Sequence, residues 1–442
     1  MEINFGIAQL PASQINVVGK KIVDVKWRSD EMINGHILLA GGSGTGKTHN
    51  IRKIIREIVN SSRHQVRVHI FDVHDDIEIA GDSGVIFSES TSYGLNPLNI
   101  DEDIHTGGVR KAIQNFINTI NKTSRKLGDR QEAVLRSLME DLYSANGFNA
   151  DDPKTWRIND GIQRKYQKKC PNVDDLARFA SFRYKKMFVG GDSRSAVALE
   201  KLNKETVKMQ NLIKEGNADA TEKLESLKEK AIESYTDFVS GIKTGREIDE
   251  LLKFDSKTTL KSVLDRIENL KNGGIFKNTP PNFDENTPVW RYRIKNLGSE
   301  EKKMFLYFRL RELYLNALKR GVQDEIVEVI VIDEANKFMD ADPDNIISIM
   351  ANEIRKFGTA LVCASQAFTH FTDDFISSVA TKMVIGIDEM YWEKTCRQLQ
   401  IKKEHLEWVK PRETALIQLK RNSSDPNDKT DKIKWFFTKL SP

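Results

Sequence analysis

Short apolar runs alternate with amphipathic helical patterns near the start of the chain. The run Ile37–Ala40 stands directly before a glycine-rich stretch, and its length is typical of a buried parallel strand. After the glycines, apolar residues recur at the spacing of one helix face: Ile51, Ile54, Ile55, Ile58 and Val59. A second buried strand is predicted at 66–71, directly before Asp72.

The same alternation returns in the last third of the chain. Ser299–Arg320 is predicted as one long helix, because acids near its start and bases at its end complement the helix dipole. Strand-like runs follow at 327–332, 359–364, 382–387, 414–419 and 433–437. Alternating strands and helices predict an α/β fold with a mostly parallel sheet that is covered on both faces.

The middle of the chain has a different pattern. Residues 195–250 are rich in Lys and Glu, with apolar residues at helical spacing, which predicts a helical hairpin. This segment is either a solvated excursion or an arm that faces DNA or a partner. The predicted parts are a short β-rich segment at 1–30 (strand-like at 15–19 and 22–25), a first core half at 31–106, a helical insertion at 107–280 and a second core half at 281–442.

Composition adds little to this picture. The net charge of +4 neither demands nor excludes a nucleic-acid partner. No apolar stretch approaches the roughly 20 residues of a membrane helix, and the first residues do not resemble a secretory signal. The three cysteines form no zinc or redox spacing, and Cys363 lies in an apolar run that predicts a core position. We therefore expect a cytoplasmic protein with no membrane segment.

The glycine-rich stretch after the first buried strand fits the phosphate-loop pattern G-x-x-x-x-G-K-[ST] in full. Glycines there let backbone N–H groups wrap phosphate oxygens, and Lys47 is expected to reach the β- and γ-phosphates. Thr48 is expected to offer its hydroxyl to Mg²⁺. A glycine turn that binds nothing is the alternative, but the flanking strand and helix favour an ATP site. The candidate nucleotide-binding residues are Gly41, Gly42, Ser43, Gly44, Thr45, Gly46, Lys47, Thr48 and His49.

An apolar run that ends in Asp333 and Glu334 complements this loop. Asp333 is assigned to Mg²⁺, and Glu334 to polarising the attacking water as a general base. The adjacent Glu argues against kinases and most GTPases. Gln366, after the run at 359–364, is a candidate for sensing the γ-phosphate or is a plain loop amide. Arg355 is a candidate arginine finger for a neighbouring subunit or is plain surface.

These motifs together resemble the HerA branch of the HerA/FtsK superfamily. The resemblance covers roughly residues 30–420 and rests on an ordered set of segments. They are His36-Ile37-Leu38-Leu39-Ala40, Phe71-Asp72-Val73-His74-Asp75-Asp76, Leu95-Asn96-Pro97-Leu98, Asp333-Glu334-Ala335-Asn336-Lys337-Phe338, Arg355-Lys356-Phe357-Gly358 and Ser365-Gln366. The chain departs from the family where Asn336 replaces a usual His and where Asp75 and Asp76 replace a Gly-Glu pair. The segment before the first core strand also looks too short for the usual β-barrel.

The resemblance implies a RecA-like P-loop NTPase of the additional-strand type with a large helical insertion. It implies a homo-hexamer that binds ATP between subunits and moves double-stranded DNA through its centre. Relatives of this kind work with an effector, either a nuclease or a sirtuin-type NAD hydrolase, in DNA end processing or antiphage defence.

Three functions remain open from the sequence. The first is a DNA translocase, for which two basic clusters are candidates: Lys122, Arg125, Lys126 and Arg130, and Arg183, Lys185 and Lys186 with the aromatic Phe182, Tyr184 and Phe188. The second is an ATP-dependent regulatory ring that assembles and controls an effector. The third is a type IV secretion-like motor.

Overall fold

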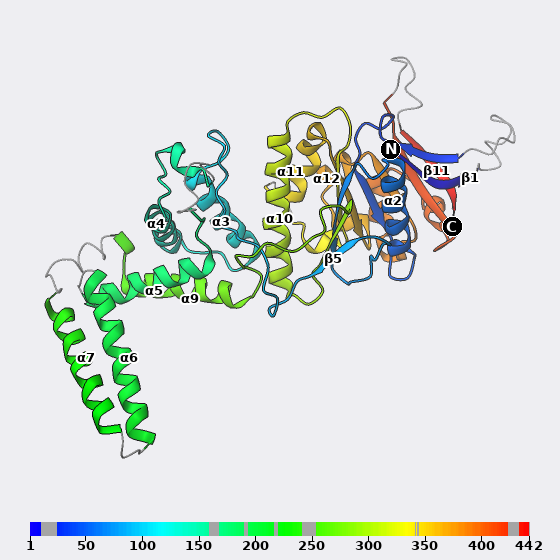
Figure 1. Cartoon of the computed structure of the whole chain (residues 1–442). Helices are drawn as coiled ribbons and strands as arrows, with labels where there is room; N and C mark the ends of the chain where they lie inside the picture. The colour runs from blue at the N-terminus through cyan, green and yellow to red at the C-terminus, as the bar shows by residue number, and fades with distance from the viewer. Residues whose placement is uncertain are drawn as a thin grey trace. The chain divides into compact units, whose positions relative to one another are not determined.

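The computed structural model describes residues 1–9, 24–158, 168–189, 193–215, 220–240, 253–340, 342, 344–422 and 433–441 (Figure 1). The chain forms two compact units. The first combines Met1–Leu95 with Pro281–Pro442, and the second is Asn96–Pro280. The strand expected at 15–19 lies outside the described residues.

The first unit is built on one eleven-stranded sheet within the described residues, in the order β2-β1-β11-β10-β9-β3-β8-β7-β4-β6-β5. All neighbours from β9 to β5 are parallel, and all neighbours from β2 to β9 are antiparallel. The strands are β1 Glu2–Ala8, β2 Asp24–Arg28, β3 Ile37–Ala40, β4 Arg67–Asp72, β5 Ser83–Ile86, β6 Val289–Arg293, β7 Glu328–Ile332, β8 Thr359–Ser365, β9 Thr381–Val384, β10 Thr414–Lys420 and β11 Ile433–Leu440.

The strand order confirms the predicted α/β fold of the additional-strand type. β8 lies between β3, which leads into the glycine-rich loop, and β7, which ends before the paired acids. The strand expected at 382–387 is wrong at its end, because β9 stops at Val384 and Gly386 then turns the chain with a φ of 114°. β1 and β2 extend the sheet through β11, so the described N-terminal residues build no separate barrel.

Helices cover both faces of the parallel sheet. The predicted apolar face of α2 (Lys47–Ser61) is buried against alternate residues of the strands, among them Leu39, Val331 and Val362. α10 (Ser299–Arg320) has the predicted bounds and packs Phe305 against Phe87, with ring centres 4.5 Å apart. Figure 1 shows α10, α11 and α12 on the other side of the sheet from α2. The remaining short helices of this unit are η2 Ala335–Lys337, α11 Ile346–Glu353, η3 Ile354–Phe357, η4 Phe368–His370, α12 Asp373–Ser378, η5 Glu389–Tyr391, α13 Trp392–Leu399 and α14 Lys403–Glu407.

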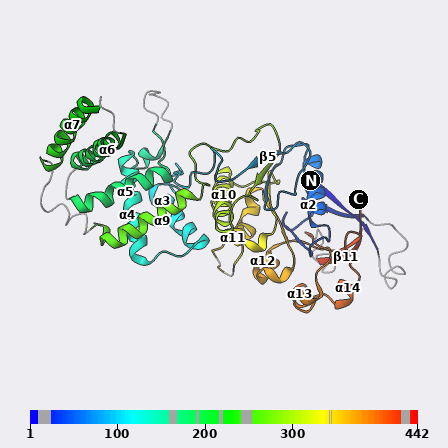
Figure 2. The ribbon, with the colours of Figure 1, turned by 90° about the horizontal axis from the view of Figure 1, so that it is seen from below.

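The second unit is helical in its described residues. Its elements are α3 Val109–Thr123, α4 Asp129–Ala145, η1 Pro153–Trp156, α5 Val173–Val189, α6 Ser193–Glu215, α7 Ala220–Ser240 and α9 Lys257–Asn272. α6 and α7 lie side by side in Figures 1 and 2, which confirms the hairpin expected within 195–250. No described helix of either unit is long and apolar enough to cross a membrane.

A buried charge cluster shapes the turn that follows β4. The carboxylate of Asp72, fully buried, accepts hydrogen bonds from the backbone N–H groups of Asp75, Asp76 and Ile77. Arg291 on β6, only 6% exposed in its side chain, lies within 3.3 Å of Asp72, 3.1 Å of Asp75 and 2.8 Å of Asp82. The guanidinium therefore neutralises carboxylates that have little access to water.

Replacing Arg291 by Met is expected to destabilise the first unit by about 3–5 kcal/mol, because buried carboxylates lose their cation. For a unit of this size the melting temperature would fall on the order of 10 °C, which thermal unfolding can measure. Arg293→Met is the matched control, since Arg293 lies on β6 like Arg291 and pairs with Asp75, but is 29% exposed. An equal loss in both variants would contradict the role given to burial.

Candidate nucleotide-binding site

The glycine-rich loop connects β3 to α2 and is fixed by hydrogen bonds at its base. The N–H of Gly41 donates to the Ser365 carbonyl at 3.1 Å, and a Cβ at Gly41 would lie 2.5 Å from the Thr45 hydroxyl oxygen. Gly46 precedes the first helical residue with a φ of 101°, a conformation that favours glycine. The loop therefore needs glycine for space at one end and for backbone conformation at the other.

Lys47 extends back across this loop. Its ammonium group donates to the carbonyls of Gly41 at 2.7 Å and Gly42 at 3.0 Å. Burial lowers the pKa of Lys47, while the nearby acids Asp333, Glu334 and Asp76 oppose this shift. The side chain thus places a cation directly beside the loop where phosphate oxygens would be held.

Three oxygen-bearing side chains meet beside Lys47. The Thr48 hydroxyl donates to Asp76 at 3.0 Å, and Asp333 lies buried at the end of β7. Burial, together with the charges of Asp76 and Glu334, raises the pKa of Asp333 to about 6. Hydroxyl and carboxylate oxygens are the donors that Mg²⁺ prefers, so this set fits the ion that the sequence predicted.

Glu334 has an unusual backbone conformation. Its φ is 48° and its ψ is 44°, in the left-handed region that a non-glycine residue enters at a cost. The carboxylate bonds to the Nε2 atom of His74 at 3.0 Å and pairs with the ammonium of Lys337. Burial raises the pKa of Glu334, but the bonds from Lys337 and His74 outweigh burial and hold that pKa below its usual value. The side chain is thus an ionised acceptor with a fixed orientation.

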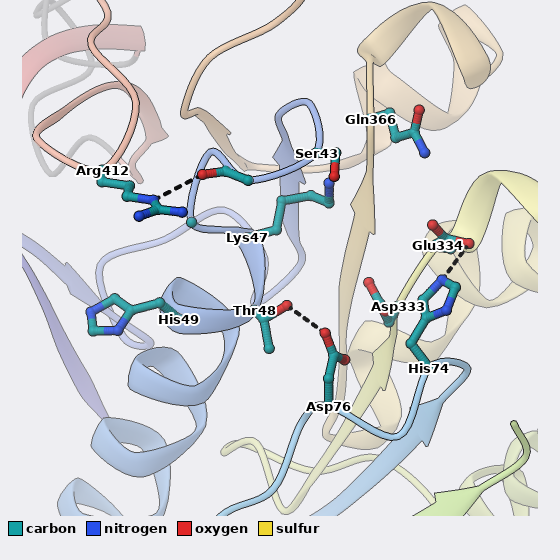
Figure 3. A pocket seen from close by; sticks show the side chains of 12 residues that line it. Ser43, Lys47, Thr48, His49, His74, Asp76, Asp333, Glu334, Gln366 and Arg412 are labelled. Atoms are coloured by element: carbon teal, nitrogen blue, oxygen red, sulfur yellow. Dashed lines mark hydrogen bonds and ion pairs between the residues drawn. The ribbon is translucent and has the colours of Figure 1, made fainter.

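These groups line one cavity of about 490 Å³, shown in Figure 3. Its lining residues are Ser43, Gly44, Gly46, Lys47, Thr48, His49, His74, Asp76, Asp333, Glu334, Gln366 and Arg412. Gly41, Gly42 and Thr45 were predicted as nucleotide-binding residues but do not line the cavity. They hold the shape of the loop, since the Thr45 hydroxyl donates to the Gly42 carbonyl at 2.9 Å. Arg355 is exposed on η3, outside the residues that line this cavity.

Three residues of the cavity were not predicted from the sequence: His74, Asp76 and Arg412. His74 and Asp76 follow β4, whose carboxyl end lies at the same sheet edge as those of β3 and β7. Polar residues after a predicted parallel strand are the signal that could have found them. Arg412 precedes β10 and carries no such local signal.

The additional-strand α/β sheet carries a complete phosphate loop after β3 and paired acids after β7, and these features together define a P-loop nucleotide hydrolase. The family model "Helicase HerA, central domain" matches residues 16–299, well over half of the chain, so the chain belongs to that family. The predicted resemblance to HerA-like motors and the predicted ATP hydrolase class are thereby confirmed.

Two solved structures extend the comparison over the whole chain. VirB4 of Thermoanaerobacter pseudethanolicus is 15% identical with a TM-score of 0.57, and the match covers 100% of this chain and 96% of that one. The plasmid coupling protein TrwB, in complex with the non-hydrolysable ATP analogue ADPNP, is 11% identical with a TM-score of 0.50, covering 99% and 95% of the two chains. At these identities the likeness concerns the fold. No curated protein sequence matches the chain.

Proposed function

We propose that this protein is an ATP-hydrolysing motor that assembles as a homo-hexamer, moves double-stranded DNA and serves an effector protein. The observation that carries the proposal is the meeting of Lys47, Thr48, Asp333 and Glu334 in one cavity of a HerA-family chain. ATP and Mg²⁺ are the cofactors that this set suits, and the TrwB structure with an ATP analogue supports the choice.

Each residue has a distinct part in the proposed reaction. Lys47 and the loop N–H groups bind the β- and γ-phosphates and stabilise charge on the transferred phosphoryl group. Thr48 and Asp333 would hold Mg²⁺, which supplies positive charge beside those phosphates, and Asp76 would support Thr48 through its hydrogen bond. Glu334, oriented by His74, would accept a proton from the attacking water. Gln366, exposed at the cavity wall, would orient that water or contact the γ-phosphate.

The basic residues of the two clusters proposed to contact DNA differ in how exposed their side chains are. Arg125, Lys126 and Arg130 are exposed on the helical unit, as a DNA contact requires. Arg183 is largely buried and bonds to Asp141 at 2.9 Å, so its charge is already paired. The side chain of Phe188 lies outside the described residues.

Two alternatives remain for what the motor does. A type IV secretion-like motor is supported by the likeness to VirB4, which spans nearly all of both chains. An ATP-dependent ring that controls a nuclease or NAD-hydrolase effector, in antiphage defence or DNA end processing, would need little translocation. It is supported by β1 and β2, which extend the sheet where HerA-like relatives are expected to carry a docking barrel.

Steady-state ATP hydrolysis with and without linear duplex DNA, measured beside the mass of the particle in solution, tests the proposal. The proposal expects a ring-sized particle whose turnover rises with DNA. A ring with slow hydrolysis that ignores DNA would favour the regulatory alternative, and absence of any hydrolysis would refute the motor. A nuclease- or NAD-hydrolase-type effector would be sought by co-purification.

Arg355 is expected to complete the site of a neighbouring subunit as an arginine finger. Arg355→Ala and Lys47→Ala should each be inactive alone, yet mixed rings should recover part of the ATP turnover. The recovery would arise where an Arg355→Ala subunit, with an intact Lys47, meets a neighbour that supplies Arg355. The control mixes Arg355→Ala with a variant that carries both Arg355→Ala and Lys47→Ala. This mixture should recover no ATP turnover, because no subunit supplies Arg355. No recovery at any ratio of the single variants would remove Arg355 from this role.

A further inference from the structure

Arg412 is bonded to the tip of the phosphate loop from a distant part of the sequence. It lies in the turn between α14 and β10 with a φ of 66°, a conformation that a non-glycine residue adopts only where its surroundings hold it. Its backbone N–H donates to the Thr45 carbonyl at 3.2 Å. Its Nε donates to the Gly44 carbonyl at 2.9 Å. Backbone and side chain are thus both fixed against the loop.

The rest of the guanidinium faces the cavity. Arg412 lines the cavity, and among the described residues no group is bonded to its two terminal nitrogens and no acid pairs with it. The Nε bond to Gly44 sets the plane of the group without using the terminal N–H donors. A guanidinium held in this way presents a fixed fork of donors that matches phosphate oxygens.

The position of Arg412 within the cavity indicates which phosphate it would meet. In Figure 3, Arg412 and His49 lie at one end of the view, and Glu334, His74 and Gln366 lie at the other, with Lys47 and Thr48 between them. Lys47 is expected to bind the β- and γ-phosphates, and Glu334 lies at the γ-phosphate end, where water attacks. The opposite end, near Arg412, is therefore the end of the α-phosphate and the nucleoside.

We propose that Arg412 is a nucleotide-binding residue that contacts the α-phosphate end of the nucleotide bound to its own subunit. The proposal rests on the proposed ATP site and adds a residue to it. It also distinguishes Arg412 from Arg355, which is expected to act on a neighbour's nucleotide. Since ADP and ATP share the α-phosphate, Arg412 would hold both to the same extent.

The test is the affinity of the full-length protein for ADP and for the ATP analogue ADPNP, measured by calorimetry with Mg²⁺. Arg412→Met is expected to lower both affinities by a similar factor, roughly tenfold, because it removes charge-assisted hydrogen bonds to phosphate. Arg412→Lys keeps the charge and should recover part of the affinity. Arg397→Met is the matched control, because Arg397 is 77% exposed on α13 and lies outside the cavity.

The outcomes separate this inference from the proposed function. A loss for ADPNP alone would overturn it and make Arg412 a γ-phosphate contact. Unchanged affinity for both nucleotides would also overturn it. The melting temperature of Arg412→Met would also be compared with that of the unmodified protein, with and without ADP. If the variant melted lower by the same amount in both cases, Arg412 would only support the loop. Failure of the unmodified protein to bind either nucleotide would instead refute the proposed ATP site.

Discussion

Replacing Lys47 by Ala is expected to abolish ATP turnover, with a loss of at least about a hundredfold. The ammonium of Lys47 lies within 3.0 Å of two carbonyls of the phosphate loop, so it is already placed where phosphate charge would gather. Alanine removes this charge but leaves the glycines and the helix N-terminus. We therefore expect weak residual nucleotide binding and no measurable hydrolysis in a phosphate-release assay.

The matched control for this variant is Lys228→Ala on α7. Lys228 lies on the helical unit and, among the described residues, pairs with Glu225, one turn away. The Lys228→Ala substitution should leave ATP turnover unchanged. Normal turnover in Lys47→Ala would take the phosphate loop out of the reaction, whereas a matching loss in both variants would point to general damage.

Replacing Glu334 by Gln is expected to keep ATP bound while hydrolysis falls roughly 10²–10⁴-fold. The amide has nearly the size of the carboxylate, yet it cannot take the proton of the attacking water. Its oxygen can still accept the bond from His74, which lies 3.0 Å from the carboxylate. Equilibrium binding of ATP together with single-turnover hydrolysis would separate the two effects.

A second acid-to-amide change controls for the loss of charge. Glu389 lies on η5, outside the residues that line the cavity. The Glu389→Gln variant should therefore hydrolyse ATP at the normal rate. If Glu334→Gln hydrolysed ATP as fast as the unmodified protein, Glu334 would not be the base. A loss of ATP binding as well would assign Glu334 to holding the nucleotide.

Much of the fold was predictable because its signals are local. The bounds of α10 followed from the acids and bases at its two ends, and the apolar face of α2 followed from its spacing. β5 and β6 were missed, since β5 has four residues including a glycine and β6 contains two arginines where the other core strands have apolar runs. Arg291 on β6 is charged but buried, and only its three partner carboxylates explain that position.

Some residues of the candidate site could likewise be predicted from local sequence, and others could not. The phosphate loop is one unbroken run of residues, and so is the pair Asp333 and Glu334. The chemistry of each could therefore be assigned from residue type and spacing. Asp76 and His74 stood in a segment noted for its resemblance, without a chemical role. They reach the cavity because β4 is parallel to β7 and ends at the same edge of the sheet.

The sequence alone determined the class of the protein, because a phosphate loop needs its glycines, lysine and threonine in an unbroken run between a strand and a helix. Only the tertiary structure decided which distant side chains share the cavity with that loop. Arg412 follows Gly44 by more than 300 residues, and its hydrogen bond to Gly44 exists because β10 and the turn before it fold back beside β9 and β3. Strand order sets such contacts, and strand order depends on packing across the whole sheet and not on local spacing.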